Sequence, residues 1–435
     1  MSRIAAIDWT EVQTEVVETL QAFLRIDTTN PPGREEAAAR YLGQLLEREG
    51  LTTEYFDAGD GRVSLRSVLR GDGTHAPLML LNHTDVVPAE AELWQTNPFE
   101  GAIRDGCLWG RGAIDMKGMG ILELMVLLLA KRMHLPLTRD IVFLAVADEE
   151  TGGSKGIEFL DRERPDILRE PEYCLNEGGI ATLEFLGVKR PAFACSPAEK
   201  GPLWLRLRAR GAPGHGSIPH SQNAVVRLVH ALTAIERWER ATKILPLTQA
   251  ILDQIAQAGA WPSGAPSVES LRSTNPNFAA MVSNTISLTT LTAGMKHNVI
   301  PASAEATLDC RLLPGESHEA FVADLRNVID DPDIKVEVVF RSESGTSNWD
   351  TDLVSIVQEV VQEEVETALV LPVTSVGFTD SRVLRRHGVH TYGFMPMLMP
   401  PELAKGIHGH DERIPLDSLG QGCRILFEVV RRLAT

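Results

Sequence analysis

The stretch DIVFLAVADEETGG, residues 140–153, places three consecutive acidic residues directly after a run of apolar ones. The apolar run does not alternate with polar residues, which is typical of a strand that is covered on both faces of its sheet. Adjacent carboxylates repel one another, so either all three face water or another group offsets the repulsion. The stretch therefore predicts a buried strand that ends in a concentration of negative charge.

Residues 1–198 alternate between helical and strand patterns. Amphipathic helices are predicted for EVVETLQAFLRI and EAAARYLGQLLEREG, and a buried helix for GMGILELMVLLLAKRM. Strands are predicted for PLMLLNHTDVVP, DIVFLAVADEE and EYCLNEGG. This order predicts an α/β domain with a mostly parallel central sheet.

The pattern changes near residue 199. PLWLRLRARG alternates strictly between apolar and polar residues, as expected for a sheet with one solvated side. Helices and strands that end with IKVEVVF follow, and they predict a small α+β unit with an excursion at 243–280 around WPSGAPS. The α/β pattern then resumes. The prediction is a discontinuous first domain, 1–198 and 343–435, into which residues 199–342 are inserted.

Composition and charge argue against several classes of protein. The net charge of −17 repels nucleic acid and anionic membranes. The five cysteines are scattered without a CxxC pair, which favours a reducing compartment over a disulfide framework. The N-terminus has no basic region before an apolar core, and the most apolar stretch, ILELMVLLLA, is too short to cross a bilayer. We therefore expect a cytoplasmic protein that binds neither nucleic acid nor membranes.

Four other segments carry residues that suit metal binding or proton transfer. LLNHTDVVP places His83 and Asp85 after an apolar strand, where the carboxylate of Asp85 can fix the tautomer of His83. LWGRGAIDMKGMG crowds glycines around Asp115, NEGG places Glu177 after another strand, and GIHGHDERIP supplies His408. Each segment taken alone is also consistent with a turn, a helix cap, a solvated strand end or a polar loop.

Together, these segments predict a metal site. In open α/β sheets, ligands bind at the carboxyl ends of the strands, where the acidic stretch and the four segments are expected to meet. Carboxylate oxygens and imidazole nitrogens suit zinc, manganese or cobalt. Two cations would offset the repulsion within the acidic triplet, so that one carboxylate binds metal and its neighbour moves protons.

The motifs HTD (83–85), GRGAIDMKG (110–118), DEETGG (148–153) and NEGG (176–179) carry a family resemblance. In this order they resemble metallopeptidase family twenty, the dinuclear zinc exopeptidases and amidohydrolases that include aminoacylase, acetylornithine deacetylase, succinyl-diaminopimelate desuccinylase and carboxypeptidase S. The resemblance runs over essentially the whole chain. It implies a zinc-exopeptidase-like catalytic domain with an inserted, ferredoxin-like α+β domain that serves as a lid and for dimerisation.

The resemblance also implies a role for each motif residue. Asp115 would bridge two divalent ions, most simply zinc, with cobalt or manganese as alternatives, through a cis peptide bond to Met116. Glu149 would be the general base, and Asp85 would orient His83. The remaining implied metal ligands are His83 and Glu177 on one ion, and Glu150 and His408 on the other.

The inserted unit and the last segment are expected to hold the substrate. The resemblance implies that His215, in GAPGHGSIPH, reaches into the site of a partner subunit and polarises the scissile carbonyl. Asn298 and Arg311 match lid residues that hold the substrate carboxylate, for which the fork of an arginine is suited. In VGFTDSR, Gly377 and Arg382 keep the frame of a substrate-binding loop. Val376 and Phe378 depart from its glycine-rich pattern, so the resemblance does not define the pocket for the acyl group or the side chain.

The expected reaction is hydrolysis of an amide bond, and two substrate classes stay open. Glutamate at position 177 favours an N-acyl amino acid deacylase, because the peptidase members tend to carry aspartate there. The FTDSR loop and the long excursion resemble carboxypeptidase S-like members and favour a dipeptidase or carboxypeptidase. A non-catalytic metal-binding protein is a remote alternative, and the presence of Glu149 argues against it.

Overall fold

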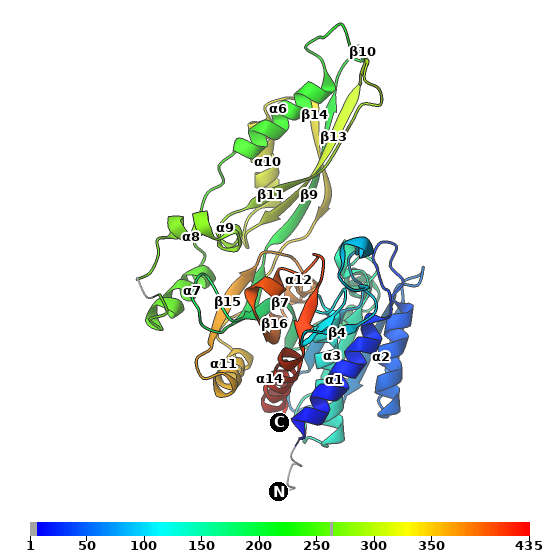
Figure 1. Cartoon of the computed structure of the whole chain (residues 1–435), viewed down its shortest axis with the longest axis vertical. Helices are drawn as coiled ribbons and strands as arrows, with labels where there is room; N and C mark the ends of the chain where they lie inside the picture. Colours follow the sequence, from blue (N-terminus) through cyan, green and yellow to red (C-terminus); the bar gives the residue numbers. More distant parts are fainter. Residues whose placement is uncertain (1–6, 262–263) are drawn as a thin grey trace.

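The computed structural model describes residues 7–261 and 264–435 of the chain. Part of the stretch WPSGAPS lies outside these residues. Figure 1 shows a larger unit at the N- and C-termini and a narrower unit that extends away from it. Within the described ranges, no helix is both long and apolar enough to cross a membrane.

The larger unit is built on a mixed sheet of eight strands. Four of its seven neighbouring pairs are parallel and three are antiparallel, so the predicted, mostly parallel α/β sheet is confirmed. In spatial order the strands are β1 (Thr53–Asp57), β2 (Val63–Leu69), β6 (Ile141–Val146), β3 (Leu78–His83), β7 (Tyr173–Thr182), β16 (His390–Met399), β8 (Ala192–Glu199) and β15 (Leu369–Ser375).

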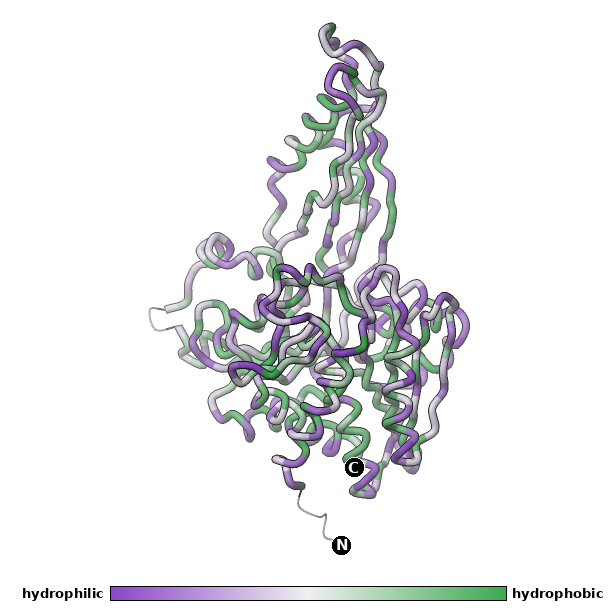
Figure 2. Tube along the Cα trace, turned by 45° about the vertical axis from the view of Figure 1, so that its right-hand side comes forward, coloured by the Kyte–Doolittle hydropathy of each residue, from purple (hydrophilic) through white to green (hydrophobic). Residues whose placement is uncertain are grey.

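Helices cover both faces of this sheet, which explains its continuous apolar strands. Along β3, Leu78 and Leu80 face one core, whereas Met79 and Leu81 face another. The first core is covered by α1 (Trp9–Leu24), α2 (Glu36–Arg48), α3 (Lys117–Arg132), α11 (Asp352–Glu364) and α14 (Leu416–Ala434). The second is covered by α4 (Ile157–Glu163), α5 (Pro165–Arg169) and α12 (Ser381–Arg386). Figure 2 shows hydrophobic segments gathered inside the larger unit.

A small antiparallel sheet lies beside the site. It consists of β4 (Ala102–Arg104), β5 (Cys107–Trp109) and β17 (Arg413–Pro415). Two short 3-10 helices, η1 (Ala91–Leu93) and η2 (Glu149–Thr151), and helix α13 (Pro401–Ala404) complete the larger unit. Because β17 pairs with β5, the C-terminal segment is brought next to the glycine-rich segment 110–118.

The smaller unit has a separate core between one antiparallel sheet and two helices. The sheet order is β11 (Thr285–Ala293), β13 (Ser303–Leu312), β9 (Gly201–Arg210) and β14 (Ile334–Arg341). The helices are α6 (Ala224–Arg237) and α10 (His318–Ile329). Leu203, Leu205 and Leu207 of β9 are buried in this core, as their alternation predicts. The chain order of these elements is that of a ferredoxin-like fold.

The excursion forms three helices, α7 (Pro246–Gln257), α8 (Val268–Thr274) and α9 (Pro276–Met281). Ile251, Phe278 and Met281 pack with residues of β8 and β15, so these helices lie against the sheet of the larger unit. The excursion is therefore inserted with the smaller unit in sequence but packs with the larger one in space. The boundaries 1–198, 199–342 and 343–435 stay a prediction.

Helix α3 buries an ionisable group, Glu123, which is 0% exposed. Asn82 Nδ2 donates a hydrogen bond to its Oε2 at 2.8 Å. Burial raises the pKa of Glu123 well above its ordinary value of 4.5, and the hydrogen bond from Asn82 offsets this only in part. The carboxyl group therefore stays protonated beside Asn82, the residue before His83.

We expect Glu123→Gln to make stability less dependent on pH. Above pH 4.5 the folded state keeps this proton and the unfolded state loses it, so stability falls by about 1.4 kcal/mol per pH unit until the folded pKa is reached. Glutamine removes this loss and keeps an acceptor for Asn82. The thermal midpoint of the variant minus that of wild type should therefore increase from pH 5 to pH 8. A difference that does not change with pH, or an equal change in the exposed-site control Glu359→Gln, would contradict the assignment.

Candidate functional site

The sequence-predicted ligands meet at the carboxyl end of the central sheet. His83 is the last residue of β3, and Asp148, Glu149 and Glu150 follow β6. The strand predicted to end at NEGG instead continues to Thr182, and Glu177 lies just past the part of β7 that pairs with β3. Because parallel neighbours end at the same edge, three separate segments of chain bring side chains to one place.

Asp115 lies between two imidazoles. Its Oδ1 is 3.1 Å from His83 Nε2, and its Oδ2 is 3.2 Å from His408 Nε2. His408 Nε2 is also 3.2 Å from Glu150 Oε2, and His83 Nε2 is 3.6 Å from Glu177 Oε1. The two oxygens of one carboxylate thus face two different clusters of donor atoms, which is the arrangement of a bridging ligand.

Two overlapping groups of donor atoms follow from this geometry. His83, Glu149 and Glu177 form one group, and His83, Asp115 and Glu150 form another, each with its ligand atoms within 4.8 Å of one another. The Asp115–Met116 peptide bond is cis, as the resemblance implies.

Asp85 connects the ends of β3 and β6. Its carboxylate is 0% exposed and accepts hydrogen bonds from the backbone N–H groups of Glu149 and Glu150, both at 3.1 Å. Asn30 Nδ2 donates to the same carboxylate at 2.7 Å. The closest contact with His83 Nδ1 is made by the backbone oxygen of Asp85 at 3.0 Å, and the carboxylate is 3.5 Å away. Asp85 thus orients the imidazole and also holds the following acidic loop.

Asp148 shows why three acidic residues can be adjacent. Its backbone is left-handed (φ 71°), a conformation that aspartate tolerates better than most residues. Its side chain points away from the cluster that contains Glu149 and Glu150. It pairs with the buried guanidinium of Arg62 and accepts hydrogen bonds from Ser154 Oγ and the Lys155 N–H. The first acid of the triplet is therefore a structural anchor for the loop that carries Glu149 and Glu150.

Glu412 supports the loop that carries Asp115, a role that the sequence analysis did not assign. Its buried carboxylate accepts hydrogen bonds from the N–H groups of Gly112 at 3.0 Å, Ile114 at 2.7 Å and Asp115 at 3.0 Å. Arg111 NH1 donates to it at 2.8 Å. Glu412 was visible in the segment GIHGHDERIP as a candidate acidic residue. The groups that it binds lie about 300 residues away in sequence, so only the fold identifies them.

Burial and mutual repulsion dominate the electrostatics of the cluster. Burial raises the pKa values of Glu149 and Glu177 well above their ordinary range, and neighbouring carboxylates raise them further. Burial also raises the pKa of Glu150. Hydrogen bonds with Asp115 and Glu150 raise the pKa of His408 to about 10. Within the described part of the chain, no lysine or arginine lies within ion-pair distance of Asp115, Glu150 or Glu177, and His83 and His408 are the basic side chains that face these carboxyl groups.

The donor set fits divalent cations. It combines buried carboxylate oxygens with imidazole nitrogens, which zinc, cobalt and manganese accept, and such ions would offset the mutual repulsion of its carboxylates. His83 is held through Nδ1 by the carbonyl oxygen of Asp85, which directs Nε2 at the cluster. The five sequence-predicted ligands therefore lie in one cluster, and their role as metal ligands stays a prediction.

The structure does not bring every predicted site residue to this cluster. His215 lies in the two-stranded sheet of β10 (Gly214–His215) and β12 (Val299–Ile300), at the far end of the smaller unit (Figure 1). Asn298 directly precedes β12, and its carbonyl oxygen accepts the N–H of Gly216. Arg311, at the end of β13, donates through Nε and NH2 to Asp309. In this arrangement neither His215 nor Asn298 can reach the metal-ligand cluster of its own chain.

The loop after β15 lies at the junction of the two units. Gly377 is partly exposed in it. Arg382 is 1% exposed, and its guanidinium donates to the carbonyl oxygens of Thr379 and Gly152 at 2.9 and 2.8 Å. This placement makes Arg382 a support that ties the loop to the acidic loop, and it gives the side chain no surface for direct contact with a substrate.

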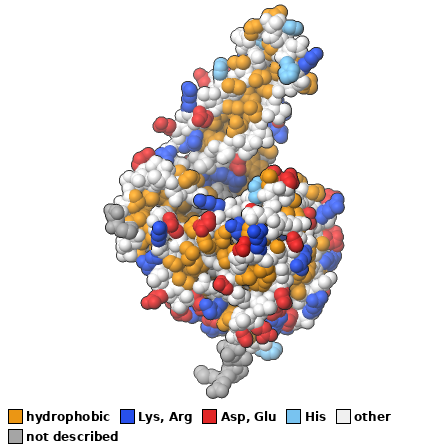
Figure 3. Space-filling view, viewed as in Figure 1, with side chains coloured by type: hydrophobic (Ala, Val, Ile, Leu, Met, Phe, Trp, Pro, Cys, Tyr) orange, Lys and Arg blue, Asp and Glu red, His pale blue; other side chains and the backbone are white. Residues whose placement is uncertain are grey.

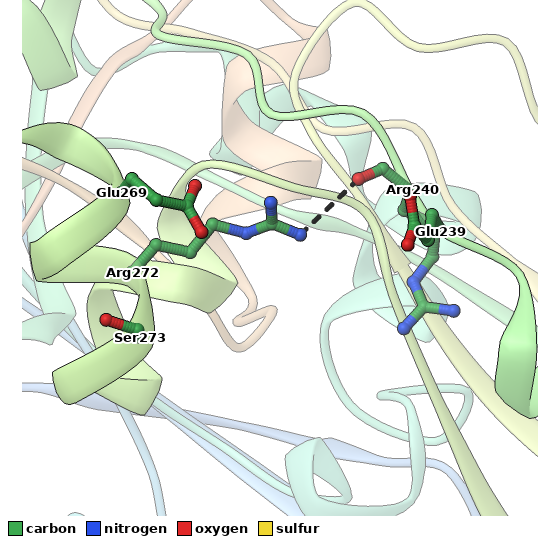
Figure 4. A pocket seen from close by; sticks show the side chains of 5 residues that line it. All are labelled: Glu239, Arg240, Glu269, Arg272 and Ser273. Atoms are coloured by element: carbon green, nitrogen blue, oxygen red, sulfur yellow. Dashed lines mark hydrogen bonds between the residues drawn. The ribbon is translucent and has the colours of Figure 1, made fainter.

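One cavity lies outside the cluster, between α8 and the segment after α6 (Figure 4). Its volume is about 510 Å³. Arg272 NH2 donates across it to the carbonyl oxygen of Arg240 at 3.5 Å. Its lining is of mixed charge and includes none of the predicted site residues: Glu239, Arg240, Glu269, Arg272 and Ser273.

Known proteins are similar to this chain in sequence and in fold. The profile of peptidase family M20/M25/M40 matches residues 79–432. Human N-fatty-acyl-amino acid synthase/hydrolase PM20D1 is 28% identical over 389 residues, which cover 85% of this chain and 77% of that protein. Aminoacylase-1 of Sus scrofa is 30% identical over 429 residues, which cover 96% of this chain and 95% of that protein.

A solved structure shows the same architecture. The M20 family metallo-carboxypeptidase Sso-CP2 of Sulfolobus solfataricus superimposes with a TM-score of 0.75 over 96% of this chain and 98% of its own, at 17% sequence identity. At this identity the likeness establishes the fold.

We expect Glu412→Gln to weaken binding of divalent cations by about 10- to 100-fold, the range for loss of a partner that orients a ligand. The amide loses the charge that holds three backbone N–H groups, so the loop that carries Asp115 loosens. Equilibrium titration with cobalt or zinc measures the effect. The neighbouring carboxylate of Asp411, which binds Gln95 instead, provides the control Asp411→Asn. Equal affinities of both variants and wild type would contradict this role of Glu412.

Proposed function

The chain belongs to peptidase family M20/M25/M40, and we propose that it is a dinuclear-metal hydrolase that cleaves the amide bond of N-acyl amino acids. The observation that carries the proposal is the position of Asp115, whose two carboxylate oxygens face His83 and His408 separately. The proposed ligands are His83, Asp115 and Glu177 on one ion, and Asp115, Glu150 and His408 on the other. Zinc is the proposed metal, with cobalt or manganese as alternatives.

Bound divalent ions would polarise the scissile carbonyl and lower the pKa of water towards 7. We assign proton transfer to Glu149, which is 7% exposed and, among the described residues, forms no ion pair with a lysine or arginine. Its pKa is raised by burial, so the carboxyl group can both accept a proton from the attacking water and return it to the departing amine. Asp85 keeps Glu149 in place through the backbone N–H.

The N-acyl amino acid class is favoured over peptides by two observations. Glu177 has the residue type expected for deacylases, and both curated relatives named above are named for N-acyl amino acid chemistry. A dipeptidase or carboxypeptidase is the second candidate, supported by the FTDSR loop and by the fold shared with a metallo-carboxypeptidase. Hydrolysis rates on N-acetyl amino acids and on dipeptides of the same residues distinguish the two. A non-catalytic metal-binding protein would hydrolyse neither.

We propose that the protein acts as a homodimer through the smaller unit. The edge strand β11 exposes Leu288 (52%) and Leu291 (57%), and α6 exposes Val226 (47%) and Val229 (49%). Figure 3 shows hydrophobic side chains along this unit. Unpaired edge strands with exposed apolar residues are sites of association. A second copy docked there would bring His215, which is far from its own cluster, towards the cluster of its partner.

The residues that would contact the substrate follow from the same proposal. Arg311 of β13 and Gly377 of the loop after β15 are proposed contacts for the substrate carboxylate, and Asn298, which lies near His215, is proposed to contact it from the second copy. Arg382 is proposed to act through the loops that it ties together. The cytoplasmic location, and the expectation that neither nucleic acid nor membranes are bound, stay predictions from the sequence.

Glu149→Gln should retain both metal ions and lose at least about 10³-fold in kcat, because the variant cannot accept the proton of the attacking water. Metal content by elemental analysis and turnover of N-acetyl amino acids measure the two effects. Glu163→Gln, at an exposed helix position, is the matched control. Near-full activity of Glu149→Gln would show that another group is the base.

Mixing two inactive variants tests the partner role of His215. If Glu149→Gln and His215→Ala are unfolded and refolded together, random pairing of a two-fold dimer should restore roughly a quarter of wild-type activity, since half the dimers are mixed and each has one complete site. No recovery, although sedimentation shows mixed dimers, would contradict action across the interface. Leu288→Lys with Leu291→Lys should yield monomers.

A further inference from the structure

Three aromatic side chains gather where the two units meet. The ring centroids of Trp204 and Phe340 are 4.9 Å apart, those of Phe340 and Phe378 are 5.9 Å apart, and those of Trp204 and Phe378 are 6.1 Å apart. All three side chains are partly exposed. We call Trp204, Phe340 and Phe378 the aromatic wall. Partly exposed aromatic surface beside a polar site is suited to bind an apolar group of a ligand.

A β-bulge places Phe340 in the wall. In β14, Val336 pairs with Leu207 and Val338 with Leu205, on the face of the sheet that carries the buried leucines of β9. Continued regular pairing would set Phe340 opposite Leu203. The register shift between Val338 and Phe340 sets it opposite Trp204 instead, on the other face. Bulges are often found next to active sites, where they redirect a side chain.

The wall adjoins both sides of the metal cluster. A methyl group built on Gly152 would lie 3.5 Å from the ring of Phe340, and Gly152 follows Glu150 by two residues. Phe378 belongs to the loop after β15. A methyl group on Gly178, next to Glu177, would lie 3.7 Å from the side chain of Thr379 in that loop. The wall is therefore connected to the acidic loop on one side and to β7 on the other.

Arginine side chains flank the wall. The guanidinium carbon of Arg311 is 4.7 Å from the ring centroid of Phe378, and that of Arg382 is 5.2 Å from it. The Nε and NH2 groups of Arg311 donate to Asp309, and none of the hydrogen bonds among the described residues uses its NH1. A guanidinium has five donor hydrogens, so NH1 can donate hydrogen bonds to a second carboxylate.

We propose that the aromatic wall is the subsite for a large apolar side chain on the amino-acid half of the substrate. This inference rests on the proposed function and on Arg311 as a partner of the substrate carboxylate. In an α-amino acid the side chain is bonded to the carbon next to the carboxylate, about 1.5 Å away. A carboxylate held at NH1 of Arg311 therefore places the side chain against Phe378, whereas the acyl group lies beyond the amide nitrogen.

Phe378 is the ring of the wall that comes from the larger unit. Val376, 37% exposed, extends the apolar surface beside it. We therefore infer that N-acyl derivatives of phenylalanine, tryptophan and leucine are better substrates than those of alanine or of charged amino acids.

The test varies the two halves of the substrate separately. Wild type, Phe340→Ala, Phe378→Gly and Trp204→Leu are assayed on N-acetyl-phenylalanine, N-acetyl-alanine and N-octanoyl-alanine. For the wall variants we expect kcat/KM on N-acetyl-phenylalanine to fall by about 10- to 100-fold, as for a pocket that loses several apolar contacts. Values on the two alanine substrates should stay within about twofold, because those substrates place no large group on the wall.

The control is Trp9→Ala, which removes another partly exposed aromatic side chain, one that packs on Phe427 at 5.8 Å and is remote from the loops of the site. It should leave the ratio of the phenylalanine to the alanine substrate unchanged. Phe340→Leu replaces Phe340→Ala in the assay if the alanine variant does not fold. Its kcat/KM should fall less, and only on the phenylalanine substrate.

Two results would overturn the proposal. A loss that follows acyl length, seen on N-octanoyl-alanine and not on N-acetyl-phenylalanine, would assign the wall to the acyl group. A uniform loss on all three substrates would assign it to packing between the units. If wild type hydrolyses no N-acyl amino acid but cleaves dipeptides, the proposed function fails. The wall is then tested independently on alanyl-phenylalanine and alanyl-alanine.

Discussion

The site depends on a single buried carboxylate, that of Asp85, which joins two strand ends. It accepts the N–H groups of Glu149 and Glu150 from the end of β6, and its own backbone oxygen receives Nδ1 of His83 from the end of β3. Burial favours protonation of Asp85, yet its hydrogen bonds with His83, Asn30 and the backbone hold its pKa below the ordinary value. The charge of Asp85 thus fixes an imidazole and an acidic loop relative to each other before any ligand binds.

The acidic triplet is stable because its three members have different environments. Asp148 is neutralised by Arg62 and by donors of its own loop, so its charge is satisfied within the scaffold. The backbone N–H groups of Glu149 and Glu150 donate to the carboxylate of Asp85, and the carboxyl groups of both glutamates remain in a buried, carboxylate-rich cluster. The scaffold therefore concentrates its unsatisfied charge at the place where cations would bind.

Local patterns in the sequence predicted the strands and the metal-ligand candidates, because buried parallel strands must be apolar on both faces and must end at the same edge. Long-range partners could not be predicted in this way. The pairing of Glu412 with the loop of Asp115, the burial of Arg382 and the packing of α7–α9 on β8 and β15 each join segments distant in sequence. The sequence also gave no sign of the bulge in β14, since IKVEVVF alternates imperfectly and fits either register.

Substrate choice must come from residues outside the metal cluster. The cluster contacts groups that every amide substrate has, a carbonyl and an attacking water, so it cannot by itself distinguish one amino acid from another. Side chains at the junction differ in this respect, because Trp204 and Phe340 come from the smaller unit and Phe378 from the larger one. A change at one of these positions alters the surface offered to the substrate and leaves the hydrogen bonds of Asp85 and Glu412 intact. This separation allows one metal scaffold to serve different amides, with selection set where the two units meet.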